Sequence, residues 1–209
     1  MTDVLFDISD YFSEKNKEKS MKLENSETIQ CLINAFTGES IARNKYTFYA
    51  KIAKKEGYEQ ISEIFLETAK NEQEHAKLFY KEIPNGAHTP NSYYPFFLGN
   101  TYENLISACT AERDEAESIY KYAAQTAKAE GFDEIFNLFT LIQNIERRHS
   151  HRFSVLAEEL KKETLFKKSE VSQWICLKCG HTHIGKEAPC KCPVCEHEQG
   201  YFKLFIENF

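Results

Sequence analysis

The sequence carries one short pattern twice, as Glu72-Gln73-Glu74-His75 and as Glu146-Arg147-Arg148-His149. Residues three apart lie on one face of an α-helix, so the carboxylate and the imidazole of each copy point the same way. A single Glu-x-x-His is common by chance in a Glu-rich helix, where it is usually part of a solvated face. Two copies at an offset of 74 residues instead indicate a repeated unit that gathers Glu and His side chains.

Identical residues recur at the same offset elsewhere in the chain: Tyr46 and Tyr120, Ala53 and Ala127, Glu56 and Glu130, Gly57 and Gly131, and Phe65 and Phe139. With one residue inserted in the second half, Glu39 corresponds to Glu112. Two related helix hairpins joined by a long connection predict a four-helix bundle with one extended crossover.

Segments rich in Ala, Glu, Lys and Leu and nearly free of Gly and Pro predict helices at about 26–55, 58–82, 101–129 and 132–163. The Pro- and Gly-rich segment 84–100 forms the long connection. We therefore predict four parts: a solvated N-terminal extension at 1–25, a bundle at 26–163, a polar linker at 164–172 and a cysteine-rich module at 173–209.

The predicted first and third helices add Glu39 and Glu112 to the repeated pattern, and Glu115 lies one turn beyond Glu112. One Glu from each of two helices and Glu-x-x-His from the other two is the arrangement known for ferritin-like di-iron proteins. Carboxylates on the apolar face of a helix are costly to bury unless they are paired with a compensating charge. Two divalent cations remove that cost, because five carboxylates and two ferrous ions sum to about −1. Oxygen ligands with some imidazole suit iron or manganese better than copper.

The cysteine-rich module contains Cys176-x-x-Cys179 and Cys192-x-x-Cys195, with twelve residues between the two pairs. Each pair makes a tight turn that directs two sulfurs at one ion, and two such turns close a tetrahedral site. The spacing alone suits structural zinc at least as well as iron. Cys190 is a further thiol, but it breaks the spacing, so Cys192 is the expected ligand.

Several motifs together resemble the rubrerythrin family. The helical ones are Gly38-Glu39-Ser40-x-Ala42-Arg43-Asn44-x-Tyr46, Glu72-x-Glu74-His75-Ala76, Glu112-x-x-Glu115 and Glu146-x-x-His149-x-x-Arg152-Phe153. Those of the cysteine module are Trp174-x-Cys176, Gly180, Cys192-Pro193 and Tyr201-Phe202-x-x-Phe205. This resemblance implies a mainly α fold: a ferritin-like four-helix bundle followed by a small rubredoxin-like domain of zinc-ribbon-like β structure. Glu196 departs from the family, since rubredoxins usually carry Gly after the fourth cysteine.

The resemblance also implies roles for individual residues. Glu72 and Glu146 are expected to bridge two non-haem irons, and Glu39, Glu112 and His149 to bind one iron each. Glu115 and His75 are expected to exchange at one iron as its oxidation state changes. Tyr46 and Tyr120 match tyrosines that hydrogen-bond the ligand carboxylates. One further iron is expected on four cysteines: Cys176, Cys179, Cys192 and Cys195.

The function implied is that of a di-iron peroxidase that reduces hydrogen peroxide to water. Electrons would come from an external donor, a rubredoxin or an NAD(P)H-dependent reductase, through the four-cysteine iron. The family also implies a head-to-tail homodimer. Two alternatives stay open: iron oxidation and storage as in ferritins, and a non-enzymatic sensing or scaffold role with zinc on the cysteines.

Composition and sequence patterns argue against some other classes of protein. The net charge of −6 argues against nucleic acid, whose binding needs concentrated Lys and Arg. No apolar stretch approaches the roughly 18–20 residues that a membrane helix needs. The N-terminus lacks the basic and apolar regions of a signal peptide, so a cytoplasmic location is expected.

Overall fold

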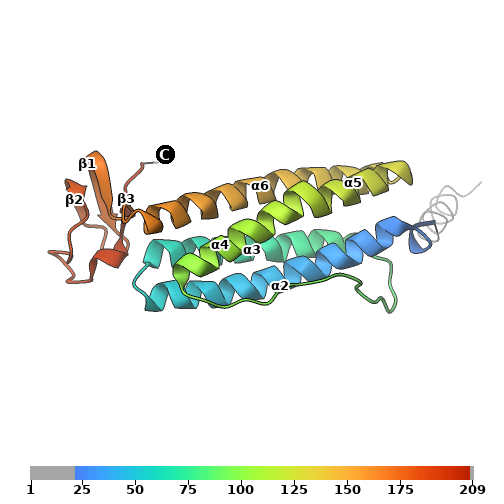
Figure 1. The fold of residues 1–209 in the computed structure, drawn as a ribbon, viewed down its shortest axis with the longest axis horizontal. Coiled ribbons are helices and arrows are strands. Elements are labelled where there is room, and N and C mark those ends of the chain that lie inside the picture. Colours follow the sequence, from blue (N-terminus) through green and yellow to red (C-terminus); the bar gives the residue numbers. More distant parts are fainter. Residues whose placement is uncertain (1–21, 208–209) are drawn as a thin grey trace, which may run out of the picture.

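The computed structural model describes residues 22–207, so most of the extension predicted at 1–25 lies outside the described residues. Long helices make up most of the chain: α2 (Glu27–Lys55), α3 (Glu59–Glu82), α4 (Thr101–Asp114), α5 (Tyr120–Ala129) and α6 (Asp133–Lys161). A five-residue π-helix, Glu115–Ile119, joins α4 to α5, so these three form one continuous rod. Figure 1 shows four rods side by side, which confirms the predicted four-helix bundle. None of the helices among residues 22–207 has the length and apolar character to cross a membrane.

The repeat in the sequence corresponds to an approximate two-fold symmetry of the bundle. Both hairpins turn at a glycine with a φ of 83°, Gly57 in the first and Gly131 in the second. In each hairpin, the residue just before this glycine binds the other hairpin. Glu56 accepts hydrogen bonds from the backbone N–H and hydroxyl of Thr101, at 2.9 and 2.6 Å. Glu130 accepts the corresponding bonds from Thr28, at 2.9 and 2.5 Å. Each carboxylate thus satisfies free N–H groups at a helix N-terminus, where negative charge is favoured.

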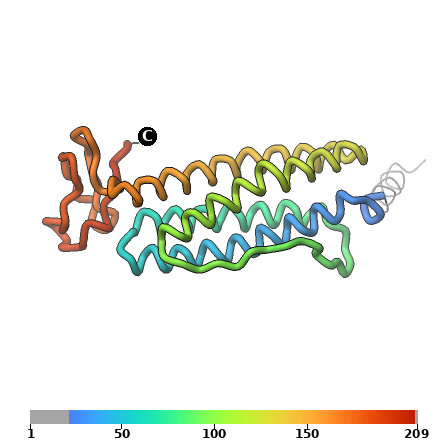
Figure 2. Tube along the Cα trace, in the orientation of Figure 1, coloured from blue at the N-terminus to red at the C-terminus, as the bar shows by residue number. Residues whose placement is uncertain are grey.

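The crossover at residues 84–100 has no helix or strand and runs extended along α2 (Figure 2). Asn34 on α2 makes two bonds to the backbone of Asn91, at 2.8 and 3.1 Å. Farther along, the hydroxyl of Tyr49 donates to the carbonyl of Phe97 at 2.9 Å. The crossover is therefore fastened to α2 at two points, in its middle and near its C-terminal end.

Two apolar clusters fill the bundle. One lies toward the Glu27 end of α2 and contains Phe79, Tyr120 and Phe139. The other lies toward its Lys55 end and is built around Tyr46 and Phe65, together with Phe153. Aromatic rings at centroid distances of about 5 to 6 Å join each cluster, as between Phe79 and Phe139 at 4.9 Å. A polar layer of buried Glu and His side chains separates the two clusters.

The cysteine-rich module is a three-stranded antiparallel sheet in the order β2-β1-β3. Its strands are β1 (Lys167–Cys176), β2 (Thr182–Glu187) and β3 (Phe202–Leu204). Strand β1 begins inside the segment 164–172 for which the sequence predicts a linker. The polar residues of that segment lie on an exposed, irregular part of the strand, so their polarity marks solvent exposure and not the absence of structure.

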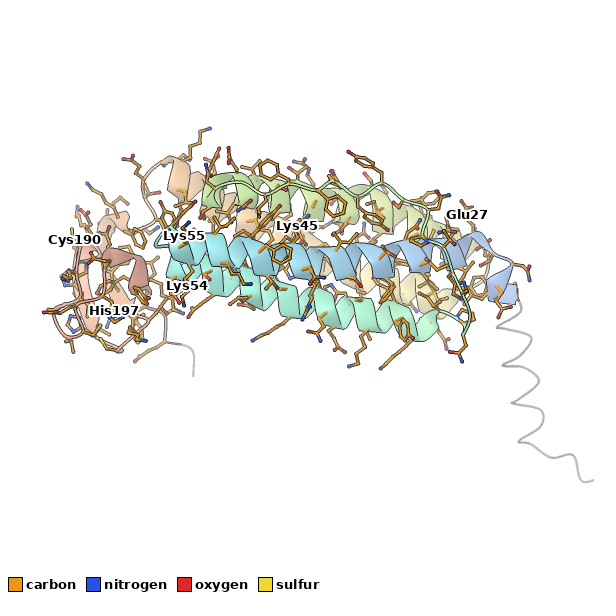
Figure 3. All side chains as sticks on the ribbon, turned by 90° about the horizontal axis from the view of Figure 1, so that it is seen from below. Glu27, Lys45, Lys54, Lys55, Cys190 and His197 are labelled. Carbon is orange, nitrogen blue, oxygen red and sulfur yellow. The ribbon has the colours of Figure 1, made fainter. Side chains whose placement is uncertain are left out.

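The module packs on the end of the bundle where α2 turns into α3. Figure 3 shows Cys190 and His197 of the module near Lys54 and Lys55, at the opposite end of the molecule from Glu27. A Cβ on Gly200 would lie 1.7 Å from the carbonyl oxygen of Gly57, so only glycine permits this approach. The rings of Tyr58 and Phe166 stack beside it with centroids 6.3 Å apart. The predicted mainly α fold with a small β module is confirmed.

Candidate metal centres

The polar layer inside the bundle brings together six side chains from four rods. Helix α2 supplies Glu39, α3 supplies Glu72 and His75, α4 supplies Glu112, and α6 supplies Glu146 and His149. All six are buried, with His75 the most exposed at 4%. They form two groups of four, and in each group the candidate ligand atoms lie within 4.8 Å of one another. Glu72 and Glu146 belong to both groups, as two ions bridged by shared carboxylates would require.

The two imidazoles occupy equivalent places in the two groups. Nδ1 of His75 lies 2.8 Å from Oε2 of Glu72 and 2.9 Å from Oε1 of Glu146. Nδ1 of His149 lies 2.8 Å from Oε2 of Glu146 and 3.3 Å from Oε1 of Glu72. The remaining carboxylates complete the groups, with Glu39 3.6 Å from His75 and Glu112 3.2 Å from His149.

Several buried ligand atoms have no hydrogen-bond partner, which tests whether cations fit. These are Oε2 of Glu39, both carboxylate oxygens of Glu72, Nδ1 of His75 and Oε1 of Glu146. Nδ1 of His75 is close to two carboxylates, yet none of these contacts has hydrogen-bond geometry. Unpaired buried polar atoms that converge on a common point are costly unless a cation lies there. Hard oxygen donors with one imidazole per group fit iron or manganese.

Burial and mutual repulsion perturb these groups when no cation compensates them. Burial and the charge of Glu146 raise the pKa of Glu39 well above its usual range. The same causes raise the pKa of Glu112 to about 7. Burial lowers the pKa of the His149 imidazole, but contacts with Glu112 and Glu146 outweigh it and raise the pKa to about 12. In the metal-free protein, protons therefore occupy places that cations would take.

Tyr46 and Tyr120 hold one carboxylate each across the bundle. The hydroxyl of Tyr46 on α2 donates a hydrogen bond to Glu112 on α4. The hydroxyl of Tyr120 on α5 donates one to Oε1 of Glu39 on α2, at 2.5 Å. Because both rings are packed in the apolar clusters, they fix the direction of the carboxylates they bind.

Glu115 is placed differently from the other predicted ligands. It begins the π-helix and is part-exposed, and it belongs to neither group of four. Although the residue as a whole is part-exposed, burial of its carboxyl group raises the pKa well above the usual range, with the charges of Glu39 and Glu112 adding to the effect. The π-helix takes up the inserted residue: Tyr46 follows Glu39 by seven positions, whereas Tyr120 follows Glu112 by eight. A π-helix accommodates such an insertion without disturbing the helix on either side.

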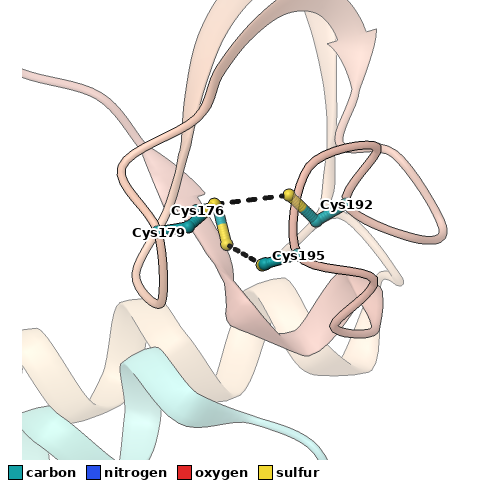
Figure 4. Close-up of side chains that lie close together, drawn as sticks. All are labelled: Cys176, Cys179, Cys192 and Cys195. Atoms are coloured by element: carbon teal, nitrogen blue, oxygen red, sulfur yellow. Dashed lines mark hydrogen bonds between the residues drawn. The ribbon is translucent and has the colours of Figure 1, made fainter.

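Four cysteines converge in the C-terminal module (Figure 4). Sγ of Cys176 lies 3.7 Å from Sγ of Cys195, and Sγ of Cys179 lies 3.6 Å from Sγ of Cys192. These distances are too long for disulfides. They match the edge of a tetrahedron around a metal at about 2.3 Å from sulfur, which is about 3.8 Å. Cys190 lies outside this group and lines a cavity between the module and the bundle.

Two similar turns present these sulfurs. The N–H of Gly180 donates to the carbonyl of Cys176, and that of Glu196 to the carbonyl of Cys192, each at 2.9 Å. Both donors have positive φ, 77° at Gly180 and 60° at Glu196. The second turn therefore holds a glutamate where backbone conformation favours glycine.

Comparison with known proteins agrees with this arrangement. The sequence model of the family described as Rubrerythrin matches residues 30–157 and 103–174. A model described as the rubredoxin-like domain of rubrerythrin matches residues 174–203. The chain belongs to the rubrerythrin family. The predicted recognition is confirmed, and both metal centres lie in the parts of the chain that match.

Relatives within the rubrerythrin family align over nearly their whole length. Rubrerythrin-1 of Clostridium acetobutylicum is 44% identical over 192 residues, which cover 90% of this chain and 98% of that protein. Rubrerythrin of Porphyromonas gingivalis is 39% identical over 196 residues, covering 93% and 98%. A solved structure of nigerythrin in a fully reduced, all-ferrous state is 28% identical, covers 87% and 90%, and has a TM-score of 0.58. A bacterioferritin of Desulfovibrio desulfuricans, at 18% identity, covers 68% and 84% with a TM-score of 0.61 and shares the bundle fold.

Sequence reasoning did not identify one residue beside the bundle site, Tyr94 of the crossover. Its ring faces Gly38, where an added Cβ would lie 3.5 Å from Cε1 of Tyr94. The available signal was Gly38 itself, because glycine in the middle of a helix is unfavourable without a local reason.

Proposed function

We propose that this protein is a non-haem iron peroxidase that reduces hydrogen peroxide to water. The observation that carries the proposal is the pair of buried carboxylate–imidazole groups that share Glu72 and Glu146. A four-cysteine site lies in the same chain, and with iron bound it would be suited to one-electron transfer. The all-ferrous state described for nigerythrin supports iron as the metal. A ferrous pair would supply the two electrons and the Lewis acidity that cleavage of the O–O bond requires.

The side chains around such a pair have distinct tasks. Glu72 and Glu146 would hold both ions, while Glu39, Glu112 and His149 would hold one each. Tyr46 and Tyr120 keep two of these carboxylates in place through their hydroxyl hydrogen bonds.

His75 and Glu115 would be alternative ligands of one ion. His75 lies inside its group and Glu115 outside, as expected for one of the two states of this exchange. The raised pKa of Glu115 allows its carboxyl group to hold a proton beside the site and to donate it to the departing oxygen.

The four-cysteine site would hold a third iron, which would supply one-electron transfer from an external donor, a rubredoxin or an NAD(P)H-dependent reductase. Glu39 lies 16 residues before the end of α2 at Lys55, which is about 24 Å of helix. The module packs beyond that end (Figure 1). This separation within one chain favours transfer between subunits, in a homodimer whose chains run head to tail.

Anaerobic reduction followed by one equivalent of hydrogen peroxide tests the proposal. We expect rapid reoxidation of the bundle iron and then of the four-cysteine iron, each followed by its absorbance. Faster reoxidation by dioxygen than by peroxide contradicts peroxidase function. Iron storage is not favoured, since storage does not need the rubredoxin-like domain that this chain carries. A colourless four-cysteine site in protein prepared with iron would favour the zinc alternative.

A further inference from the structure

A cavity of about 250 Å³ lies between the crossover, α2 and the start of the π-helix. Its lining includes Gly38, Lys45, Tyr94, Pro95, Glu115 and Tyr120. In Figure 3 the crossover runs parallel to α2 and across the rod that contains α4, and Lys45 projects from α2. The cavity therefore connects the exterior of the bundle with the side of the metal site where Glu115 lies.

Burial singles out Glu115 as the predicted bundle ligand that this cavity reaches. Among the seven predicted ligands in the bundle, the other six are buried, and Glu115 alone retains part exposure. Glu115 and Tyr120 line the cavity, and Tyr120 binds Glu39 inside the site. A small molecule in this cavity would contact Glu115 directly and lie one side chain, Tyr120, away from Glu39.

Gly38 lies between Tyr94 and Glu115 in the wall of this cavity. Its backbone is helical, so no positive φ requires a glycine. A Cβ at this position would lie 3.5 Å from Cε1 of Tyr94 and 3.8 Å from Oε1 of Glu115. These are ordinary van der Waals distances, so one methyl group fits and occupies the space between the two side chains. The missing side chain of Gly38 thus provides an opening about one methyl group wide.

Tyr94 is a fixed wall of the opening. Its hydroxyl donates a 2.7 Å hydrogen bond to the carbonyl of Asn34, one turn before Gly38. The bonds between Asn34 and Asn91 and between Tyr49 and Phe97 hold the crossover on both sides of it. The ring therefore has a defined position over α2.

We propose that Gly38 and Tyr94 form the entrance to the metal site and set its specificity, admitting hydrogen peroxide and excluding bulky organic hydroperoxides. This inference rests on the proposed function for its substrate, but the entrance itself is a property of the fold. A hydroperoxide with a branched hydrocarbon group exceeds the space over Gly38, whereas hydrogen peroxide does not.

Gly38→Ala tests the entrance. The substitution removes a helix-destabilising glycine, so the melting temperature should stay the same or rise. We expect binding of azide to the oxidised, iron-loaded protein, followed by absorbance, to slow by about tenfold or more, and reaction with hydrogen peroxide to slow in parallel. Ser40→Ala, which changes one small side chain on another face of α2 and away from the cavity, is the control and should leave both rates unchanged.

Tyr94→Ala and Tyr94→Leu should widen the opening. In both variants we expect the rate with tert-butyl hydroperoxide, relative to hydrogen peroxide, to rise by about tenfold. The proposal is overturned if azide binds to Gly38→Ala at a rate within about twofold of that of the unmodified protein. It is also overturned if the ratio of the rates with tert-butyl hydroperoxide and hydrogen peroxide is unchanged in both Tyr94 variants. Azide binding needs no turnover, so it separates the two claims. If Gly38→Ala slows azide binding but the protein has no peroxidase activity, the entrance is supported and the proposed function is contradicted. If the protein is a peroxidase but azide binding is unaffected, the proposed function is supported and the entrance is contradicted.

Discussion

Tyr120 on α5 donates a hydrogen bond to Glu39 on α2, with 2.5 Å between the two oxygens. Its counterpart in the repeat, Tyr46, makes the equivalent bond to Glu112. Each hairpin therefore orients a carboxylate of the other, and neither hairpin can complete the site alone. The two-fold repeat of the sequence is thus expressed as mutual support between the two halves.

Tyr120→Phe should weaken metal binding while the bundle stays folded. The variant keeps the ring in its apolar cluster but leaves Glu39 without its hydrogen bond. Loss of such a partner typically costs about 10- to 100-fold in metal affinity. Competition with a chelator for Fe²⁺ measures the change, with Tyr49→Phe as the control because that hydroxyl binds the crossover backbone. Equal affinities in the two variants contradict the assigned role of Tyr120.

The metal-free protein should lose stability as the pH rises. The folded-state pKa of Glu112 is raised from 4.5 to about 7, and that of His149 from 6.5 to about 12. Groups with raised pKa values bind more protons in the folded state than in the unfolded state. The free energy of unfolding therefore falls as the pH rises from the unfolded-state pKa to the folded-state pKa of each group. We expect a higher melting temperature near pH 5.5 than near pH 8.5 without metal.

The iron-loaded protein should show the opposite trend, because metal binding requires deprotonated ligands and strengthens as the pH rises. Thermal denaturation of both forms across this range makes the comparison. A metal-free protein that becomes more stable toward pH 8.5 is inconsistent with the buried, proton-holding carboxylates described above.

Glu115→Ala should impair turnover without unfolding the bundle. The variant removes a carboxyl group that holds a proton beside the site, and loss of such a group costs about 100-fold or more in rate. It also removes a carboxyl group that burial and neighbouring carboxylates make costly to ionise, so the metal-free protein should melt no lower than the unmodified one. Stopped-flow reaction of the reduced protein with peroxide measures the first effect. Unchanged peroxide kinetics would mean that Glu115 takes no part.

Glu196→Gly should stabilise the cysteine module. Glu196 has a φ of 60°, and this left-handed conformation costs a residue with a side chain about 1 kcal/mol. Gly180 already occupies the equivalent place in the first turn. Denaturant unfolding of the iron-loaded protein, followed at the four-cysteine absorbance, should show the gain. A destabilised variant would show that the Glu196 side chain makes a contact worth more than the backbone strain.

Local patterns predicted much of the bundle and of its polar layer. Helical periodicity and the 74-residue repeat indicated that Glu39, Glu112 and the two Glu-x-x-His pairs face one another, and the structure brings these six side chains together. The cysteine turns depend on spacing within a few residues, so the sequence was sufficient there too.

Features that depend on long-range backbone paths were not predictable in the same way. The inserted residue before Tyr120 was visible in the sequence, but its conformation as a π-helix, with Glu115 outside both groups, was not. The crossover has no periodicity, so nothing indicated that Tyr94 would lie over Gly38. The polar residues before Trp174 suggested a linker, because an exposed strand and a loop have similar composition.

The iron content of protein prepared and purified anaerobically tests the central claim most directly. The account predicts three irons per chain, in two environments at a ratio of two to one: oxygen and nitrogen ligands in the bundle, and sulfur ligands in the C-terminal module. Mössbauer spectroscopy of the same sample resolves these environments. A single iron per chain, or a bundle that binds only one ion at saturating Fe²⁺, contradicts the account.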